Sequence, residues 1–257
     1  MSDVPQISVV GITGLPEIKE GDDLGSMIVQ CAHRQGTPLV RGDILVVTQK
    51  VVSKAEGRLV DLNTITPSSF AAEFASHSGR DARLVELVLR ESRSVVRMDA
   101  ERGIMITETK HGFVCANSGI DSSNIFGEDN VCLLPEDPDA SAEGIRIRIR
   151  EHTDNPDVPV IISDTFGRAW REGHGNFAIG VSGMDPLRDY RGEIDASGKV
   201  LRVTNIAVAD ELAGAAELVM AKVINVPVAV VRGYVYSGVD NASIAPLLRE
   251  RSRDLFR

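Results

Sequence analysis

The fold is decided by the stretch Val158-Pro159-Val160-Ile161-Ile162-Ser163, which runs directly into Asp164-Thr165-Phe166-Gly167-Arg168-Ala169-Trp170-Arg171. A short, nearly continuous apolar run of this kind indicates a strand that is buried on both faces. In open α/β sheets, ligands bind beyond the carboxyl ends of such strands. The stretch therefore predicts a central strand that delivers Asp164 and Thr165 to a binding site.

Two further apolar runs, at residues 44–47 and 226–231, predict two more buried strands. Residues 4–12 alternate as a strand does, and residues 104–107 and 113–116 flank a predicted hairpin turn. Helical spacing or composition predicts helices in four segments, namely residues 24–31, residues 68–90 with a break at 78–80, residues 206–222, and the tail from residue 242. Residues 145–149 alternate like a strand, but Asp139 and Ser141 resemble helix caps, so we predict a helix there. The fold class is α+β, a mixed α/β arrangement.

Composition excludes several classes of protein. The 257 residues carry a formal net charge of −9, which argues against a nucleic-acid partner because such proteins concentrate Lys and Arg. The three cysteines lie in apolar runs without CxxC spacing, which indicates a reducing compartment. The sequence has no basic leader that would predict export. It also has no stretch of about 20 apolar residues that would predict a membrane partner. We expect a cytoplasmic protein.

Common catalytic and nucleotide-binding motifs do not fit. Gly198-Lys199 is followed by Val200, so a P-loop is excluded. The loose dinucleotide fingerprint at residues 173–178 follows polar residues rather than a predicted strand. The sequence also has no nucleophile elbow at residues 180–183 and no HExxH zinc motif.

Two acidic loops are candidates for a metal site, one with Asp121 and Asn124 and one with Asp164 and Thr165. Each is expected just after a strand, so both can face one cleft. Magnesium and manganese prefer oxygen ligands of these types. The alternative for either aspartate alone is a turn-capping role, which is common for Asp and Asn.

Lys50 and Lys54 follow the run at residues 44–47 and are candidates for contacts with phosphate oxygens. The alternative is two solvated lysines. His174 could act as a base, but a hydrogen-bonded surface histidine is the better explanation, so no role is assigned to it.

From about Ile7 to Gly233 the chain resembles the coenzyme F420:L-glutamate ligase (γ-glutamyl ligase) family. Five ordered blocks carry the resemblance: Gly14-Leu15-Pro16-Glu17-Ile18; Val47-Thr48-Gln49-Lys50-Val51-Val52-Ser53-Lys54-Ala55-Glu56-Gly57; Gly119-Ile120-Asp121-Ser122-Ser123-Asn124; Ser163-Asp164-Thr165-Phe166-Gly167-Arg168-Ala169-Trp170-Arg171; and Val226-Pro227-Val228-Ala229-Val230-Val231-Arg232-Gly233.

The resemblance implies one ligase module over residues 1–257, with two intimately packed subdomains and a fold that is neither P-loop nor Rossmann. Some bacterial relatives carry a fused C-terminal nitroreductase-like domain, which we expect to be absent here. The resemblance also implies a homodimer, GTP as co-substrate, Mg²⁺ or Mn²⁺ at two sites, and K⁺ as a further candidate ion.

By position, the resemblance implies that the nucleotide contacts Leu15, Pro16, Glu17, Ile18, Gln49, Lys50, Lys54 and Asn124. Asp121 and Asp164 would hold one metal ion, and Thr165 a second. Asp121, Asp164 and Lys54 would be the catalytic residues, with Arg168 and Arg171 as further phosphate or substrate contacts. Archaeal relatives place another metal ligand where this chain has Lys222, and a lysine cation cannot ligate a metal.

The resemblance implies a GTP-dependent ligase that adds L-glutamate to coenzyme F420-0 through an acyl phosphate. One alternative is a related amide ligase that acts on a different carboxylate acceptor. Another is a non-catalytic protein that binds metal and nucleotide.

Overall fold

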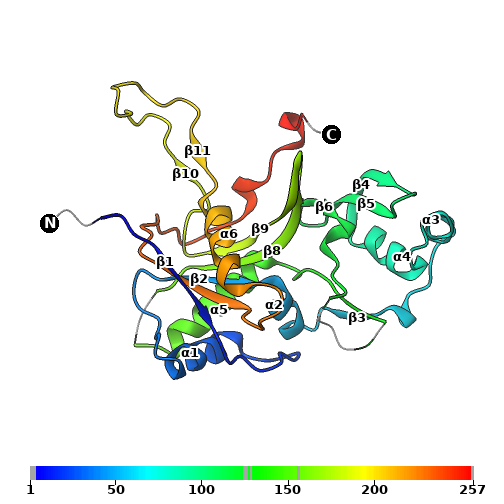
Figure 1. The fold of residues 1–257 in the computed structure, drawn as a ribbon, viewed down its shortest axis with the longest axis horizontal. Coiled ribbons are helices and arrows are strands. Elements are labelled where there is room, and N and C mark those ends of the chain that lie inside the picture. The colour runs from blue at the N-terminus through cyan, green and yellow to red at the C-terminus, as the bar shows by residue number, and fades with distance from the viewer. Residues whose placement is uncertain (1–3, 124–126, 128, 155–156, 256–257) are drawn as a thin grey trace.

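The computed structural model describes residues 4–123, 127, 129–154 and 157–255 (Figure 1). The helices are α1 Leu24–Arg34, α2 Gln49–Ala55, α3 Ser69–Ser78, α4 Ala82–Arg90, α5 Pro138–Glu151 and α6 Val208–Met220. The strands are β1 Ser8–Ile12, β2 Ile44–Thr48, β3 Leu59–Asp61, β4 Ser92–Asp99, β5 Ile104–Thr109, β6 Val114–Ala116, β7 Asn130–Cys132, β8 Val160–Arg168, β9 Arg171–Ser182, β10 Arg188–Asp189, β11 Asn205–Ile206 and β12 Val228–Arg232. Within the described ranges, every helix is too short or too polar to span a lipid bilayer.

A five-stranded sheet in the order β1-β12-β2-β8-β9 forms the centre of the molecule. The apolar runs predicted as buried strands all lie in this sheet, where β2 is parallel to β8 and antiparallel to β12. Helices α1 and α5 pack together at the lower part of Figure 1, and α6 packs against β1, β9 and β12 from the other side. The sheet is therefore covered on both faces, which explains why its strands are apolar throughout.

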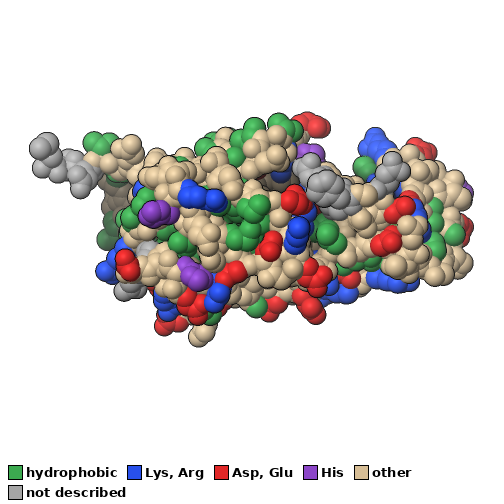
Figure 2. All heavy atoms as spheres, turned by 90° about the horizontal axis from the view of Figure 1, so that it is seen from below, with side chains coloured by type: hydrophobic (Ala, Val, Ile, Leu, Met, Phe, Trp, Pro, Cys, Tyr) green, Lys and Arg blue, Asp and Glu red, His purple; other side chains and the backbone are tan. Residues whose placement is uncertain are grey.

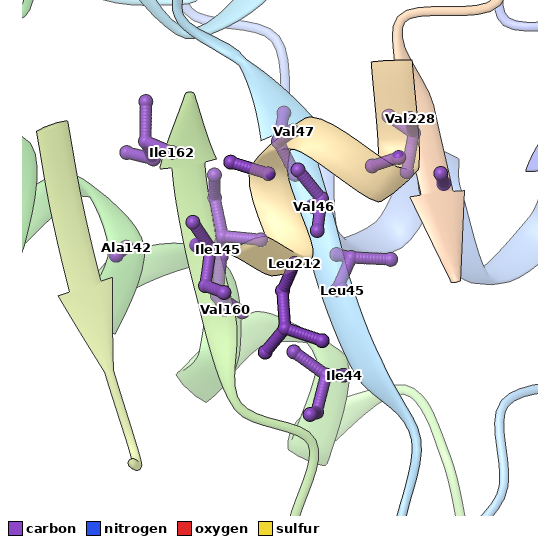
Figure 3. Packing of buried hydrophobic residues seen from close by; sticks show 14 of the residues in the cluster. Ile44, Leu45, Val46, Val47, Ala142, Ile145, Val160, Ile162, Leu212 and Val228 are labelled. Atoms are coloured by element: carbon purple, nitrogen blue, oxygen red, sulfur yellow. The ribbon is translucent and has the colours of Figure 1, made fainter. Parts of the chain in front are cut away.

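The main core lies between this sheet and its helices. Ile44, Leu45 and Val46 of β2 are fully buried, and the close view in Figure 3 shows them beside Leu212 of α6 and side chains of β8. Burying a side chain of this size contributes about 1.5–3 kcal/mol to folding.

A smaller part of the chain, from β3 to β7, has its own cores. Helices α3 and α4 pack against the three-stranded sheet β4-β5-β6 at the right of Figure 1. Phe74, Val88 and Met105 form one buried cluster here, and Leu62, Leu87 and Val131 belong to a second cluster. These clusters are separate from the main core, as two packed subdomains would require.

Several local predictions are confirmed. Residues 24–31 lie in helix α1, which Asp23 caps by accepting a hydrogen bond from the Ser26 N–H. Residues 145–149 lie in helix α5, as predicted, but the helix is capped by Asp137, and Asp139 and Ser141 lie inside it. The break within residues 68–90 falls at Gly79, which has a left-handed φ of 68°. Gly112 ends the turn between β5 and β6.

Two local predictions are wrong. The tail from residue 242 to residue 255, its described part, is not an α-helix and contains 3₁₀ turns at Ala245–Leu247 and Arg251–Arg253. Pro246 explains why no α-helix runs on from residue 242, because inside such a helix its ring would clash with the carbonyl of Ala242. Asp164 lies within β8 rather than after it, because β9 continues the pairing past this residue, with Asp164 opposite Phe177.

The surface is mixed in charge. On the described part of the face drawn in Figure 2, acidic side chains are interspersed with basic ones, without a continuous basic tract. This agrees with the formal net charge of −9.

Candidate active site

A cavity of about 790 Å³ opens where the parallel pairing of β2 with β8 ends. Thr48 at the end of β2 lies opposite Ser163 of β8 in the register of the sheet. The far wall comes from the smaller part of the chain, at residues 115–121. The cavity therefore lies between the two parts, at the carboxyl edge that the sequence predicted.

Helix α2 brings lysines to this cavity. It begins directly after β2, so Gln49, Lys50 and Lys54 all line the opening. The Nζ of Lys54 lies 2.6 Å from Oε1 of Glu17, and only 8% of Lys54 is exposed. Gln49 is also buried, and its Oε1 accepts a hydrogen bond from the Ser53 hydroxyl at 2.9 Å. The lysines are thus held in place and are not free surface groups.

Asp121 faces these lysines from the opposite wall. Its backbone pairs with Cys132, and its carboxylate accepts a hydrogen bond from the Ser123 N–H at 2.7 Å. The Nζ of Lys50 lies 2.7 Å from Oδ2 of Asp121. Burial raises the pKa of Asp121, but the hydrogen bonds from Lys50 and Ser123 outweigh it, so the pKa is lowered overall. Asp121 is ionised at neutral pH.

Asp164 lines the same cavity, but its pKa is shifted in the opposite direction. Burial raises its pKa to about 7, and the negative charge of Asp121 adds to the effect. The Thr165 N–H and the charges of Lys222 and Lys50 act in the other direction without reversing it. Two carboxylates from separate stretches of chain therefore share one cavity, and one of them binds a proton near neutrality.

Cys115 lies on the same wall but is not a nucleophile. Burial, helped by the charge of Asp164, raises the pKa of its thiol to about 12. The thiol stays protonated and unreactive at neutral pH.

A chain of hydrogen bonds holds Thr165. Its hydroxyl donates to Oδ1 of Asn176 at 2.7 Å, and Nδ2 of Asn176 donates to Glu217 of α6 at 2.9 Å. The ammonium of Lys222 donates to the Thr165 hydroxyl and lies 3.7 Å from Glu217. The four side chains form a closed network at the edge of the cavity.

The remaining predicted site residues fall in different places. Leu15, Pro16, Glu17 and Ile18 line the cavity, and their contact with a nucleotide stays a prediction. His174 also lines it. Asn124 lies outside the described residues.

Arg168 and Arg171 are not among the residues that line the cavity. Both are exposed at the tip of the β8–β9 hairpin, and Arg168 donates to the carbonyl oxygens of Glu172 and Gly173. Their predicted contact with phosphate or substrate stays a prediction.

The oxygen atoms at this site suit a hard cation whose coordination shell is completed by a bound ligand. Among the described residues, no group of three or more His, Cys, Asp and Glu side chains is arranged to hold a metal ion. Asp121 and Asp164 supply two carboxylates, and Thr165 supplies a hydroxyl. Magnesium and manganese commonly bind through one or two carboxylates together with water and substrate phosphates. The residues therefore fit Mg²⁺ or Mn²⁺ in the presence of a phosphate ligand.

Sequence reasoning missed three residues of this site: Ser163, Asn176 and Glu217. Asn176 lies opposite Thr165 on β9, which is visible only from the register of the hairpin. Glu217 reaches the network from α6, which is far away in sequence. The unusual polarity of Asn176 between the apolar or glycine positions 175 and 177–181 was the available signal.

Comparisons with known proteins agree with this geometry. A family model described as F420-0:Gamma-glutamyl ligase matches residues 13–233. The chain is 43% identical to the coenzyme F420:L-glutamate ligase of Methanothermobacter thermautotrophicus over 254 residues, which cover 98% of this chain and 99% of that protein. It is 41% identical to the protein of the same name from Methanopyrus kandleri, with full coverage of both chains. The corresponding protein of Methanocaldococcus jannaschii is 40% identical, with 98% and 97% coverage.

Proposed function

The chain belongs to the F420-0:γ-glutamyl ligase family, and from this premise we propose that it joins L-glutamate to coenzyme F420-0 at the expense of GTP. The relatives named above carry the name coenzyme F420:L-glutamate ligase, which supports the substrate and the class of reaction, a ligase that forms an amide bond. The dependence on GTP and the acyl phosphate route are part of the proposal.

One observation carries the proposal: Asp121 and Asp164 face a common cavity together with Lys50 and Lys54. Carboxylates that share a cavity with lysines suit a ligand that brings phosphates and a divalent cation together. Had the two aspartates lain on different faces of the molecule, this chemistry would have had no site.

The proposed reaction has two steps. The terminal carboxylate of the deazaflavin substrate attacks the γ-phosphorus of GTP, which forms an acyl phosphate and releases GDP. The amine of L-glutamate then attacks the acyl carbon, forms the amide, loses a proton and releases inorganic phosphate. Activation is required because a carboxylate is itself a poor acyl donor.

The residues of the chain contribute position and charge. Lys50 and Lys54 neutralise negative charge that moves toward the leaving GDP oxygen. Their ion pairs with Asp121 and Glu17 hold both ammonium groups in the cavity before the nucleotide arrives, so less ordering is needed during the reaction.

A divalent cation would be held by Asp121 and Asp164, whereas the Thr165 hydroxyl, which the resemblance gives to a second cation, accepts a hydrogen bond from Lys222. Such an ion, Mg²⁺ or Mn²⁺, supplies electrostatic stabilisation of the phosphate oxygens. K⁺ and the homodimer remain predictions of the same resemblance.

Mass spectrometry of the deazaflavin product tests the proposal. Incubation of the protein with coenzyme F420-0, GTP, Mn²⁺ and L-glutamate should add whole glutamyl residues to F420-0, with one GDP and one phosphate released for each. Glutamylation without consumption of GTP would overturn the proposed energy source. GTP turnover with another carboxylate in place of F420-0 would instead identify a related amide ligase, and binding without turnover would leave a binding protein.

A further inference from the structure

Ser163 carries a buried hydroxyl without a hydrogen-bond partner. It is 1% exposed, and its Oγ contacts no donor or acceptor within the described part of the chain. The residue nevertheless lines the cavity between β2 and β8. Buried polar groups are almost always paired, so an unpaired group at a cavity wall requires an explanation.

Other buried serines of the chain are satisfied. Ser53 donates to Gln49, the Ser118 hydroxyl lies 2.8 Å from that of Thr107, and Ser182 donates to Glu143. None of these three side chains lines the cavity. Of these four serines, Ser163 is the one that both lines the cavity and carries an unpaired hydroxyl.

The sheet fixes this hydroxyl at the cavity wall. Ser163 lies opposite Thr48 in the parallel ladder, and the pairing of β8 with β9 shifts register between Ile162 and Ser163. Irregularities of this kind redirect side chains and are enriched next to active sites. The backbone therefore presents the serine to the cavity in the absence of any ligand.

The charges of the same cavity indicate which ligand can accept a hydrogen bond from the Ser163 hydroxyl. Lys50 and Lys54 line it from the helix that follows Thr48, and both are cations that bind anionic oxygens. A hydroxyl beside such lysines can donate a hydrogen bond to an oxygen of the same anion.

We propose that Ser163 is a substrate-contacting residue whose hydroxyl donates a hydrogen bond to a phosphate oxygen of the bound nucleotide. The inference rests on the proposed use of GTP and adds a contact that the sequence blocks do not assign. The same hydroxyl lowers the stability of the ligand-free protein and raises the affinity for the anion. The unpaired group destabilises the free protein and is satisfied only when the anion is bound.

Comparison of Ser163→Ala with Ser182→Ala tests the proposal. In the nucleotide-free protein, Ser163→Ala should leave the midpoint of thermal unfolding unchanged or raise it, because it removes an unpaired buried hydroxyl. Ser182→Ala should lower the midpoint, because it removes a hydroxyl that has a partner. Calorimetric titration with a non-hydrolysable GTP analogue should then show about ten- to hundredfold weaker binding for Ser163→Ala and parent-like binding for Ser182→Ala.

Two further ligand conditions separate the possible contacts. Guanosine should bind both variants as it binds the parent, and the loss with the GTP analogue should persist in EDTA. A loss that vanishes in EDTA would assign the hydroxyl to a metal-bound water, and an equal loss with guanosine would assign it to the nucleoside. Either result overturns the proposal, as does unchanged affinity for the GTP analogue.

Failure of the proposed function gives a different result. If the parent protein binds no guanine nucleotide, both the use of GTP and this contact are wrong. If Ser163→Ala does not fold, Ser163→Cys preserves most of the volume with a weaker donor. It should bind the GTP analogue more weakly than the parent, and parent-like affinity would overturn the contact.

Discussion

The ammonium of Lys50 lies 2.7 Å from Oδ2 of Asp121 and joins helix α2 to the opposite wall of the cavity. The same ammonium donates to the carbonyl oxygen and the hydroxyl of Ser123, at 2.7 and 2.9 Å. One lysine thus connects the main sheet to the smaller part of the chain. It also helps to keep Asp121 ionised beside Asp164.

We expect Lys50 and Asp121 to be energetically coupled. A double-mutant cycle with Lys50→Met and Asp121→Asn should give a coupling of about 1 kcal/mol in the free energy of unfolding at low salt, and a smaller value at high salt. Urea unfolding of the four proteins measures it. The pair Arg191 and Asp189, at the base of the projecting β10–β11 segment, is the exposed control and should couple more weakly. Equal coupling in the two pairs would contradict a special role for Lys50.

Replacement of Asp164 should affect turnover more than folding. Asp164→Asn keeps the shape of the side chain but removes the carboxylate that would hold a cation. We expect product formation to fall by on the order of 100-fold or more, with the parent circular dichroism spectrum. Asp195→Asn provides a control in an exposed turn outside the cavity and should retain parent activity. An Asp164→Asn protein that folds and forms product at the parent rate would remove Asp164 from the site.

The raised pKa of Asp164 makes stability depend on pH in the metal-free protein. The folded protein holds this proton up to about pH 7, whereas the unfolded chain loses it near the ordinary value of 3.8. Between these values the folded state binds more protons, so the contribution of Asp164 to the free energy of unfolding falls as pH rises. Asp164→Asn removes this pH-dependent decrease in the free energy of unfolding.

In EDTA, Asp164→Asn should therefore match the parent near pH 4 and become increasingly more stable than it up to about pH 7.5. A shift of this size corresponds to a gain of at most roughly 4 kcal/mol. Thermal unfolding at several pH values measures the margin. A margin that stays constant with pH would show that Asp164 ionises normally in the folded protein.

The main sheet could be predicted from the sequence because its strands are apolar on both faces. Residues 44–47 and 158–163 could only be buried strands or core helix segments, and their length and β-branched side chains favoured strands. That both deliver polar residues to one edge follows from parallel pairing. The meeting of Asp164 with the lysines of α2 was therefore predictable in outline.

The rest depended on contacts that local pattern does not encode. Asn176 meets Thr165 only because the β8–β9 hairpin has its particular register, including two irregular positions. The unpaired state of Ser163 is a property of its neighbours and not of its own sequence context. The tail does not form the predicted helix because Pro246 interrupts its helical spacing.

Asn176 should be required to hold Thr165. Asn176→Ala leaves the Thr165 hydroxyl without its acceptor and Glu217 without its donor, in a region where Asn176 is only 5% exposed. We expect a loss of about 1–3 kcal/mol in the free energy of unfolding, and weaker binding of Mn²⁺ in the presence of nucleotide. Chemical denaturation and manganese titration measure the two effects. Loss of stability with parent-like manganese affinity would leave Asn176 a purely structural residue.

Lys222 should limit the number of metal ions that the site binds. Its ammonium donates a hydrogen bond to the Thr165 hydroxyl, and its positive charge repels a second cation there. The parent protein with nucleotide should therefore bind one equivalent of Mn²⁺, and Lys222→Glu should bind two. Elemental analysis after gel filtration in Mn²⁺ and nucleotide gives the stoichiometry. Lys222→Met, which removes the charge without adding a ligand, is the matched control and should bind fewer than two equivalents. Two equivalents in the parent protein would show that Lys222 moves away from Thr165 and does not exclude the second ion.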